Sequence, residues 1–170
     1  MNAEAISHKL DTQLASQAEG EPRLKLAAQA LTQVFKLRAD EVAIFSVDKK
    51  LEMIGFLWPP KLKMTGNLPL SSNTALVART IRDGKAFVNN SFGSLSHATI
   101  FEMVKIDKDQ ADAPQRIQKI ISIPMEFNGD TVGAIQLSRK GEDGPAAGPD
   151  FGKNELALLA ELAKVIAKHI

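Results

Sequence analysis

Residues 121–140, ISIPMEFNGDTVGAIQLSRK, limit the fold of this chain more than any other segment. Asn128-Gly129 is the strongest two-residue signal for a β-hairpin, because a type I′ turn needs positive φ at both central positions. Pairing outward from this turn gives both faces of the hairpin mostly apolar side chains: Met125, Ile123 and Ile121 opposite Val132, Ala134 and Gln136 on one face, and Pro124, Ser122 and Ile120 opposite Gly133, Ile135 and Leu137 on the other. A sheet with two apolar faces must be covered on both.

The predicted long helices cover only one of these faces. Apolar residues at three- and four-residue steps predict helices over residues 3–18, 22–37 and 153–170, and the second presents a face wide enough to lie on a sheet. For the other face only a short helix over 74–83 and the irregular segment 91–119 remain. An irregular, partly polar cover over an apolar sheet tends to leave a cavity, and small ligands bind in such cavities.

Shorter apolar runs predict three further strands. Residues 42–47 and 51–58 are expected to pair as a hairpin that ends at Pro59-Pro60, because proline cannot donate to a strand ladder. Residues 85–90, KAFVNN, form a short strand that ends in two asparagines. Gly84 is the expected end of the short helix before it.

Composition narrows the possible functions. The 170 residues are 44% hydrophobic, which suffices for one domain with a sizeable core. Lys plus Arg number 21 and Asp plus Glu number 20, so we expect no nucleic-acid binding, since no basic excess exists to neutralise phosphates. Cysteine is absent, which excludes disulfides, thiolate nucleophiles and Cys-ligated metals. We find no secretory signal or membrane span, and the expected location is the cytoplasm.

The order of these elements resembles that of a GAF domain, a module of about this length in sensory proteins. The resemblance rests on LPLSSNTALVARTIRDGKAFVNN at 68–90, IISIPMEFNGDTVGAIQLSRK at 120–140 and FGKNELALLAELAKVIAKHI at 151–170. It implies an α+β fold, an α/β sandwich whose central antiparallel sheet has N- and C-terminal helices on one face and a short helix and loop lid on the other. Residues 21–170 are then the GAF-like domain, and residues 1–20 are an N-terminal helical extension.

The ligands of GAF domains include cyclic nucleotides, bilins, haem and small anions or metabolites, and the resemblance does not identify a cofactor for this chain. Bilin attachment and the free methionine sulfoxide reductases of this fold need cysteine, which is absent. Cyclic-nucleotide-binding members carry an Asn-Lys…Phe…Asp-Glu motif. Here Asn90, Phe92, Phe101 and Glu102 stand without the Lys and without the Asp-Glu pair. An axial haem ligand in the pocket region could only be His97.

The predicted ligand contacts are Trp58, Asn90, Phe92, His97, Phe101 and Ser122. Structural alternatives stay open: Trp58 can close the edge of the core, Asn90 can serve a turn, and His97 can be an exposed loop residue. Ser122 and Gln136 fall on opposite faces in the predicted register. Whichever of the two is buried needs a hydrogen-bond partner, since an unpaired buried polar group costs about 1–3 kcal/mol. We find no catalytic constellation and no set of metal ligands at suitable spacing.

Two functions remain. The first is a non-enzymatic sensory or regulatory module that binds an unidentified small molecule between sheet and lid and signals through its terminal helices to a separate effector protein. The second is a ligand-free scaffold for dimerisation or protein interaction, whose pocket is filled by its own side chains: Phe87, Phe92, Phe101 and Met103.

The terminal helices predict a homodimer. Ile6, Leu10 and Leu14 form a narrow apolar seam on the first helix, and the last helix carries a second apolar stripe besides the one expected to face the sheet. Narrow seams on terminal helices are typical of helix–helix association between chains. The alternative is that the protein's own first helices cover both stripes.

Overall fold

The computed structural model describes residues 2–94 and 115–170. Its helices are α1 (Ala3–Ser16), α2 (Glu21–Phe35), α3 (Leu76–Asp83), α5 (Gly144–Ala147) and α6 (Lys153–His169), with 3₁₀ turns η1 (Ala39–Glu41), η2 (Pro60–Thr65) and η3 (Phe92–Ser94). Its strands are β1 (Val42–Asp48), β2 (Met53–Trp58), β3 (Leu68–Pro69), β4 (Phe87–Asn89), β5 (Ile117–Phe127) and β6 (Asp130–Lys140). The predicted elements lie within two or three residues of these bounds, whereas β3 and α5 were not predicted.

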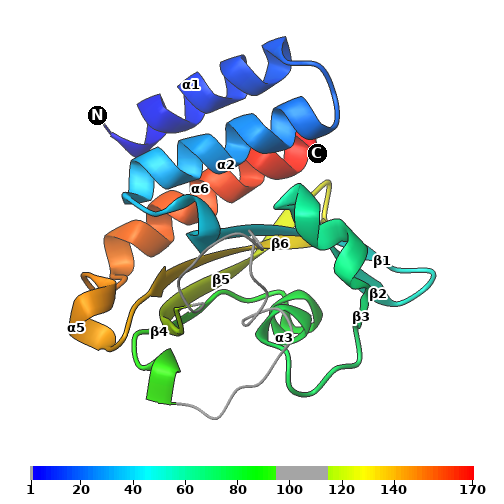
Figure 1. The fold of residues 1–170 in the computed structure, drawn as a ribbon. Coiled ribbons are helices and arrows are strands. Elements are labelled where there is room, and N and C mark those ends of the chain that lie inside the picture. The colour runs from blue at the N-terminus through cyan, green and yellow to red at the C-terminus, as the bar shows by residue number, and fades with distance from the viewer. Residues whose placement is uncertain (1, 95–114) are drawn as a thin grey trace.

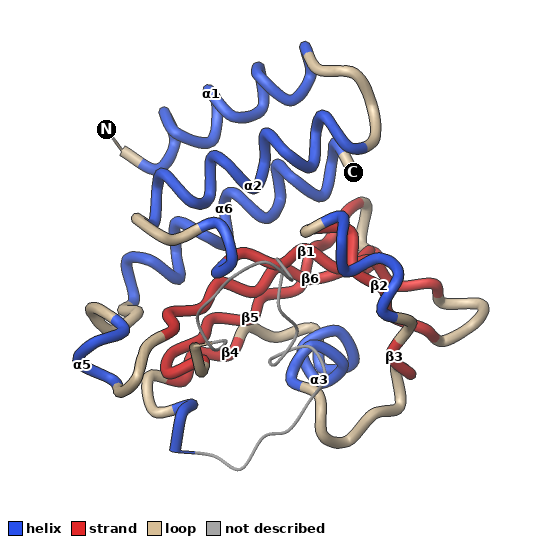
Figure 2. Tube along the Cα trace, in the orientation of Figure 1, coloured by secondary structure: helices blue, strands red, loops and turns tan. Residues whose placement is uncertain are grey.

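The elements form three layers (Figures 1 and 2). The middle layer is a six-stranded antiparallel sheet with the order β3-β2-β1-β6-β5-β4. Helices α1, α2 and α6 lie together on one side of it, and α3 lies on the other side. The predicted α+β sandwich is therefore confirmed. Most of the predicted lid, residues 95–114, lies outside the described residues.

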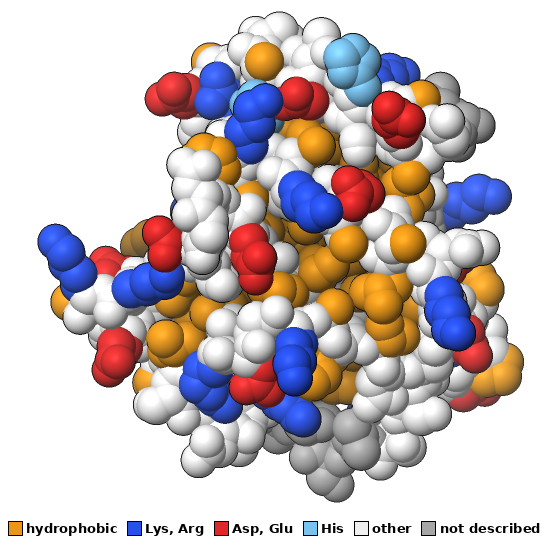
Figure 3. Space-filling model, turned by 180° about the vertical axis from the view of Figure 1, so that it is seen from behind, with side chains coloured by type: hydrophobic (Ala, Val, Ile, Leu, Met, Phe, Trp, Pro, Cys, Tyr) orange, Lys and Arg blue, Asp and Glu red, His pale blue; other side chains and the backbone are white. Residues whose placement is uncertain are grey.

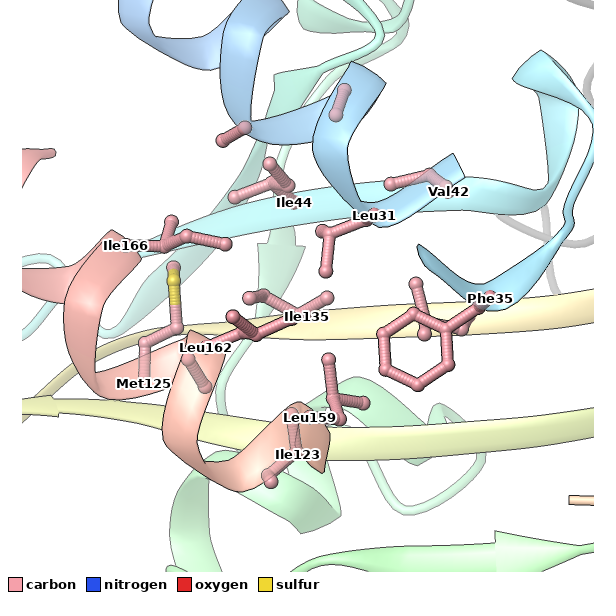
Figure 4. Packing of buried hydrophobic residues seen from close by; sticks show 14 of the residues in the cluster. Leu31, Phe35, Val42, Ile44, Ile123, Met125, Ile135, Leu159, Leu162 and Ile166 are labelled. Atoms are coloured by element: carbon pink, nitrogen blue, oxygen red, sulfur yellow. The ribbon is translucent and has the colours of Figure 1, made fainter. Parts of the chain in front are cut away.

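The sheet face toward α1, α2 and α6, here called the helix face, carries the larger core. Leu31 and Phe35 of α2 and Leu159, Leu162 and Ile166 of α6 point toward the sheet (Figure 4). They pack on seven strand residues: Val42, Ile44, Ile121, Ile123, Met125, Ile135 and Leu137. None of these twelve side chains is more than 5% exposed. Burial of each large one contributes about 1.5–3 kcal/mol, so this core is a major source of stability.

Helix α1 packs on the outer side of α6 and α2. Leu10 is 3% exposed and Leu14 is 0% exposed, and both belong to the same core as the helix face of the sheet. The seam of the first helix is thus covered within the chain, as the intramolecular alternative expects. The division into residues 1–20 and 21–170 stays a prediction. None of the helices in the described ranges is both long and apolar enough to cross a membrane.

The central hairpin has the predicted turn but not the predicted register. Asn128 has φ of 51° and Gly129 has φ of 82°, as a type I′ turn requires. Met125, however, pairs with Gly133 instead of Val132. Val132 is therefore the extra residue of a β-bulge, and the pairs from Met125–Gly133 to Lys119–Arg139 move by one position.

The backbone of β1 explains why the bulge lies beside a glycine. A Cβ at position 133 would overlap the backbone carbonyl oxygen of Phe45, so only glycine allows this close approach of β1. Pairing residues outward from the turn assumes a regular ladder and cannot include this contact. The corrected register puts Ser122 directly opposite Gln136, on the same face of the sheet and not on opposite faces.

Replacing Gly133 by Ala should lower the free energy of unfolding by about 2 kcal/mol or more, because the new methyl group meets backbone that cannot move aside easily. Gly144 is the matched control: its Cβ would meet nothing within 4 Å, so Gly144→Ala should change stability by less than about 0.5 kcal/mol. Urea unfolding of both variants measures the difference. Equal stabilities would contradict the close approach of β1.

An acidic residue of α1 joins it to the end of α6. Lys168 Nζ lies 3.1 Å from Asp11 Oδ1, and His169 Nε2 contacts the same oxygen. The hydrogen bond with His169, and then the one from Lys168, hold the pKa of Asp11 below its usual value of 3.8. The folded chain therefore favours the charged carboxylate.

Asp11→Asn should be less stable than wild type near neutral pH, and this difference should shrink in acid. A carboxylate whose pKa is lowered on folding contributes stability above 3.8 and loses it as the pH falls through the lower folded-state value. Urea unfolding at about pH 3 and about pH 7 measures the change. Glu142→Gln, at an exposed carboxylate without a described ion pair, is the control. If the free energies of unfolding of wild type and Asp11→Asn differ by the same amount at both pH values, Asp11 does not have this role.

Candidate functional site

The side of the sheet away from α1, α2 and α6, here called the front face, is partly filled by α3. Phe45, Ile54 and Phe56 of β1 and β2 form a second core there with Val77 and other residues of α3. The ring centroids of Phe45 and Phe56 are 4.7 Å apart. Free space on the front face therefore lies beyond this core, toward the ends of β2 and β6.

A small hollow of about 40 Å³ lies at that end of the front face, here called the front hollow. Its lining is apolar over Ala43, Phe56, Leu62 and Ile120, and polar at Gln136. The complete lining adds Asp40, Glu41, Val42, Pro59, Ile117, Ser138 and Lys140. A water molecule needs roughly 10–15 Å³ of such space, so the front hollow has room for a few waters or for one end of a ligand.

A directed chain of hydrogen bonds leads from the front hollow to α3. Thr80 Oγ1 lies 2.8 Å from the carbonyl oxygen of Leu76, which can only accept, so Thr80 donates its single hydrogen there. Ser122 Oγ, 2.6 Å from Thr80 Oγ1, must then donate to Thr80. Gln136 Nε2 donates to Ser122 Oγ at 3.2 Å.

Each side chain in this series of hydrogen bonds, except Gln136, is closed to solvent. Thr80 and Ser122 are both 0% exposed, so Ser122 has found the partner that its burial requires. Gln136 is half-buried and lines the front hollow. Its Oε1 atom and its second Nε2–H carry no hydrogen bond to any described residue. Gln136 is therefore a polar group with free donor and acceptor capacity in the lining of the front hollow.

The charged groups at the rim of the front hollow are paired with one another. Lys140 Nζ donates to Asp40 O at 2.8 Å and lies 3.6 Å from Asp40 Oδ2. Glu41, 6% exposed, accepts from the backbone N–H groups of Arg38 and Lys140, both at 2.8 Å, and Arg38 Nη2 lies 3.2 Å from its carboxylate. Among the described residues, Asp40 and Glu41 are thus each paired with a base, Lys140 from the lining itself and Arg38 from beside it.

A larger hollow of about 270 Å³ lies between the start of α3 and β4. Arg79 and Phe87 form one wall, with the guanidinium 4.6 Å from the ring centroid. Phe92, 5% exposed, forms another, and it also packs on Ile117 and Ile120, which line the front hollow. Phe92 therefore lies between the two hollows: it lines the larger one and packs behind the lining of the front hollow.

Comparison with solved structures identifies the architecture. A GAF domain of a phosphoenolpyruvate-protein phosphotransferase from Coxiella burnetii matches with a TM-score of 0.73 and 14% identity, over 99% of this chain and 92% of that one. The corresponding GAF domain from Acinetobacter matches with a TM-score of 0.72 and 12% identity, over 99% and 93%. The chain has the fold of a GAF domain.

The GAF fold also occurs in an enzyme among these matches. Free methionine-R-sulfoxide reductase from Neisseria meningitidis, solved in complex with its substrate, matches with a TM-score of 0.66 and 14% identity, over 98% of this chain and 87% of that one. No family model and no curated protein matches the sequence. At these identities the likeness establishes the fold and leaves the function to the site.

Two predicted contacts lie elsewhere in the GAF fold. Trp58 pairs with Ile44, so it lies on the helix face and packs against the main core, as its structural alternative expects. Asn90 Nδ2 donates to Phe151 O at 3.0 Å, and Phe151 N–H donates to Asn90 Oδ1 at 2.8 Å. These two bonds use the amide of Asn90 as a clamp between the end of β4 and the start of α6. His97 and Phe101 lie outside the described residues.

Sequence reasoning missed two features of the site. Gln136 was recognised as a polar residue in an apolar strand, but the undetected bulge put it on the face opposite Ser122. The rim network was not predicted, because Arg38 is not one of the residues that signal a helix cap in a sequence, although its N–H donates to Glu41 Oε2 as in a capping box.

Ser122→Ala and Thr80→Val should each lower the free energy of unfolding by about 1–3 kcal/mol, because each leaves buried polar groups of the chain without a partner. The double variant removes both hydroxyls together, so its loss should be smaller than the sum of the single losses by about 1 kcal/mol or more. Urea unfolding of the four proteins measures this coupling. Exposed Thr12→Val is the control, and strictly additive losses would show that Ser122 and Thr80 do not interact.

Proposed function

We propose that this chain is a sensory or regulatory module of the GAF fold that binds an uncharged small molecule at the front hollow. The observation that carries the proposal is the amide of Gln136, whose Oε1 atom and second N–H have no hydrogen bond to a described residue and which lies beside the apolar side chains of Phe56, Leu62 and Ile120. Convergent polar groups in an apolar hollow are typical of ligand sites.

The charges at the rim favour an uncharged ligand. Asp40 and Glu41 are already paired with Arg38 and Lys140, so an ionic ligand would lose its hydration without meeting an unpaired opposite charge. A ligand that carries a hydrogen-bond donor next to an acceptor, such as a carboxamide or the edge of a heterocyclic base, can bond both free groups of Gln136.

Two connections lead from this site to the rest of the molecule. The hydrogen-bond chain from Gln136 through Ser122 ends on Thr80 of α3. The clamp between Asn90 and Phe151 joins the end of β4 to the start of α6. A ligand that moves β6 or β4 can therefore bias the position of α6, through which we propose that the signal reaches a separate effector protein.

The alternative function is a ligand-free scaffold. Phe92 is 5% exposed and Phe87 lies under Arg79, so two of the four predicted filling side chains already occupy the front of the sheet; the other two lie outside the described residues. Hydrophobic side chains also gather in a band across the middle of the face seen in Figure 3. Leu158 and Val165 on α6 remain half-buried. These features favour association with a second copy, and a homodimer is part of the proposal in either function.

We propose a binding role and not a catalytic one. The absence of cysteine removes the thiolate on which thiol–disulfide and related redox chemistry depends. The hydroxyl of Ser122 donates to Thr80 and is 0% exposed, so it is not available as a nucleophile at the front hollow.

Binding of uncharged metabolites should raise the melting temperature of the wild type, and Gln136→Leu should weaken the best-binding compound at least about tenfold. Gln33→Leu, on the exposed side of α2, is the control and should bind as the wild type does. Native mass spectrometry of the same samples reports bound ligand and oligomeric state together. If the protein is a ligand-free dimer and no compound in the panel changes its melting temperature, the sensory function is wrong and the scaffold function is supported.

A further inference from the structure

Two buried cations lie opposite each other on β5 and β6, on the helix face of the sheet and not on the face that carries the front hollow. Lys119 of β5 pairs directly with Arg139 of β6. Lys119 is 6% exposed and Arg139 is 8% exposed. Like charges in directly opposed strand positions destabilise a sheet, and burial strengthens their repulsion. Such a pair needs negative charge close by.

The acceptors around this pair are few. Lys119 Nζ donates to Gly148 O at 2.6 Å and lies 2.8 Å from the carboxylate of Asp150, which is 70% exposed. Arg139 Nη2 donates to Phe35 O at 3.2 Å, at the end of α2, and the guanidinium lies 4.7 Å from the ring centroid of Phe151. One exposed carboxylate is therefore the only acid that the described residues place in contact with the two cations.

Arg139 is incompletely satisfied within this arrangement. Its Nε atom is buried and has no hydrogen-bond partner among the described residues. A guanidinium offers five N–H groups, and its Nε–H and adjacent Nη–H form a fork that matches the two oxygens of an oxyanion. Buried charges are normally paired and fully hydrogen-bonded, so this orphaned donor points to an acceptor that the described residues do not supply.

We propose that Lys119 and Arg139 form a binding site for a small oxyanion of the phosphate or carboxylate type. The anion takes the place of the Asp150 carboxylate beside Lys119 and accepts from Arg139 Nε. Asp150 can leave readily because its side chain is largely exposed and belongs to the connection between β6 and α6. The site is independent of the ligand proposed for the front hollow, since it lies on the helix face and uses none of the same residues.

Inorganic phosphate and acetate are the probes, each compared with chloride at equal ionic strength and pH on the full chain. Phosphate, acetate or both should raise the melting temperature of the wild type in a saturable manner. Comparing the two anions shows whether the site prefers a tetrahedral oxyanion or a carboxylate. Asp150→Asn removes the competing carboxylate, so half of the maximal shift should occur at an anion concentration at least about threefold lower. Asp150 is exposed, so this variant is expected to fold.

Arg139→Gln should abolish the saturable shift, and Lys164→Gln, at an exposed cation of α6, should retain it. The ³¹P line width of inorganic phosphate in the presence of wild type and Asp150→Asn gives a direct readout that does not depend on whether Arg139→Gln folds. Broadening that increases in Asp150→Asn supports the site. Equal responses of wild type, Asp150→Asn and Lys164→Gln, or no response at all, overturn it.

Discussion

Burial of β5 and β6 on both faces is the constraint on which the rest of this molecule depends. Ile121, Ile123 and Ile135 meet α2 and α6 on the helix face, while Ile120 and Ala134 are buried on the front face. Both faces of these strands must be covered by other elements. Helices α1, α2 and α6 lie together on one side of the sheet, and α3 lies on the other. The front cover formed by the described residues is smaller than the helical one, and the hollows lie beside it. The apolar surface that drives folding thus also creates the candidate site.

Polar groups within this apolar frame link the two sides. The chain from Gln136 to Thr80 joins the sheet to α3, and the clamp between Asn90 and Phe151 joins β4 to α6. A hydrogen bond in a medium of low polarity is costly to break, so these links hold the joined elements in fixed relative positions. Arg139 contacts both Phe35 at the end of α2 and Phe151 before the start of α6, so it also connects α2 to the start of α6.

Local chemistry made much of this fold predictable. The positive φ angles of Asn128 and Gly129 and the end of α3 at Gly84 follow from single residues and their neighbours, as does the need for cover on both faces of the hairpin. The site was less predictable because its residues depend on tertiary contacts. The carbonyl of Phe45 sets the bulge at Val132, and the bulge decides that Ser122 and Gln136 share a face. The clamp at Asn90 needs α6 to begin beside β4, and no local pattern in the sequence encodes that approach.

The shift in register after the bulge is the central claim, because the hydrogen-bond chain, the polar group of the front hollow and the opposed pair of Lys119 and Arg139 all depend on it. Backbone nuclear Overhauser effects across β5 and β6 in the labelled protein test it most directly. We expect cross-strand contacts between Met125 and Gly133 and between Ser122 and Gln136. Contacts between Met125 and Val132 and between Ile121 and Gln136 would show a regular ladder and would contradict the site as described.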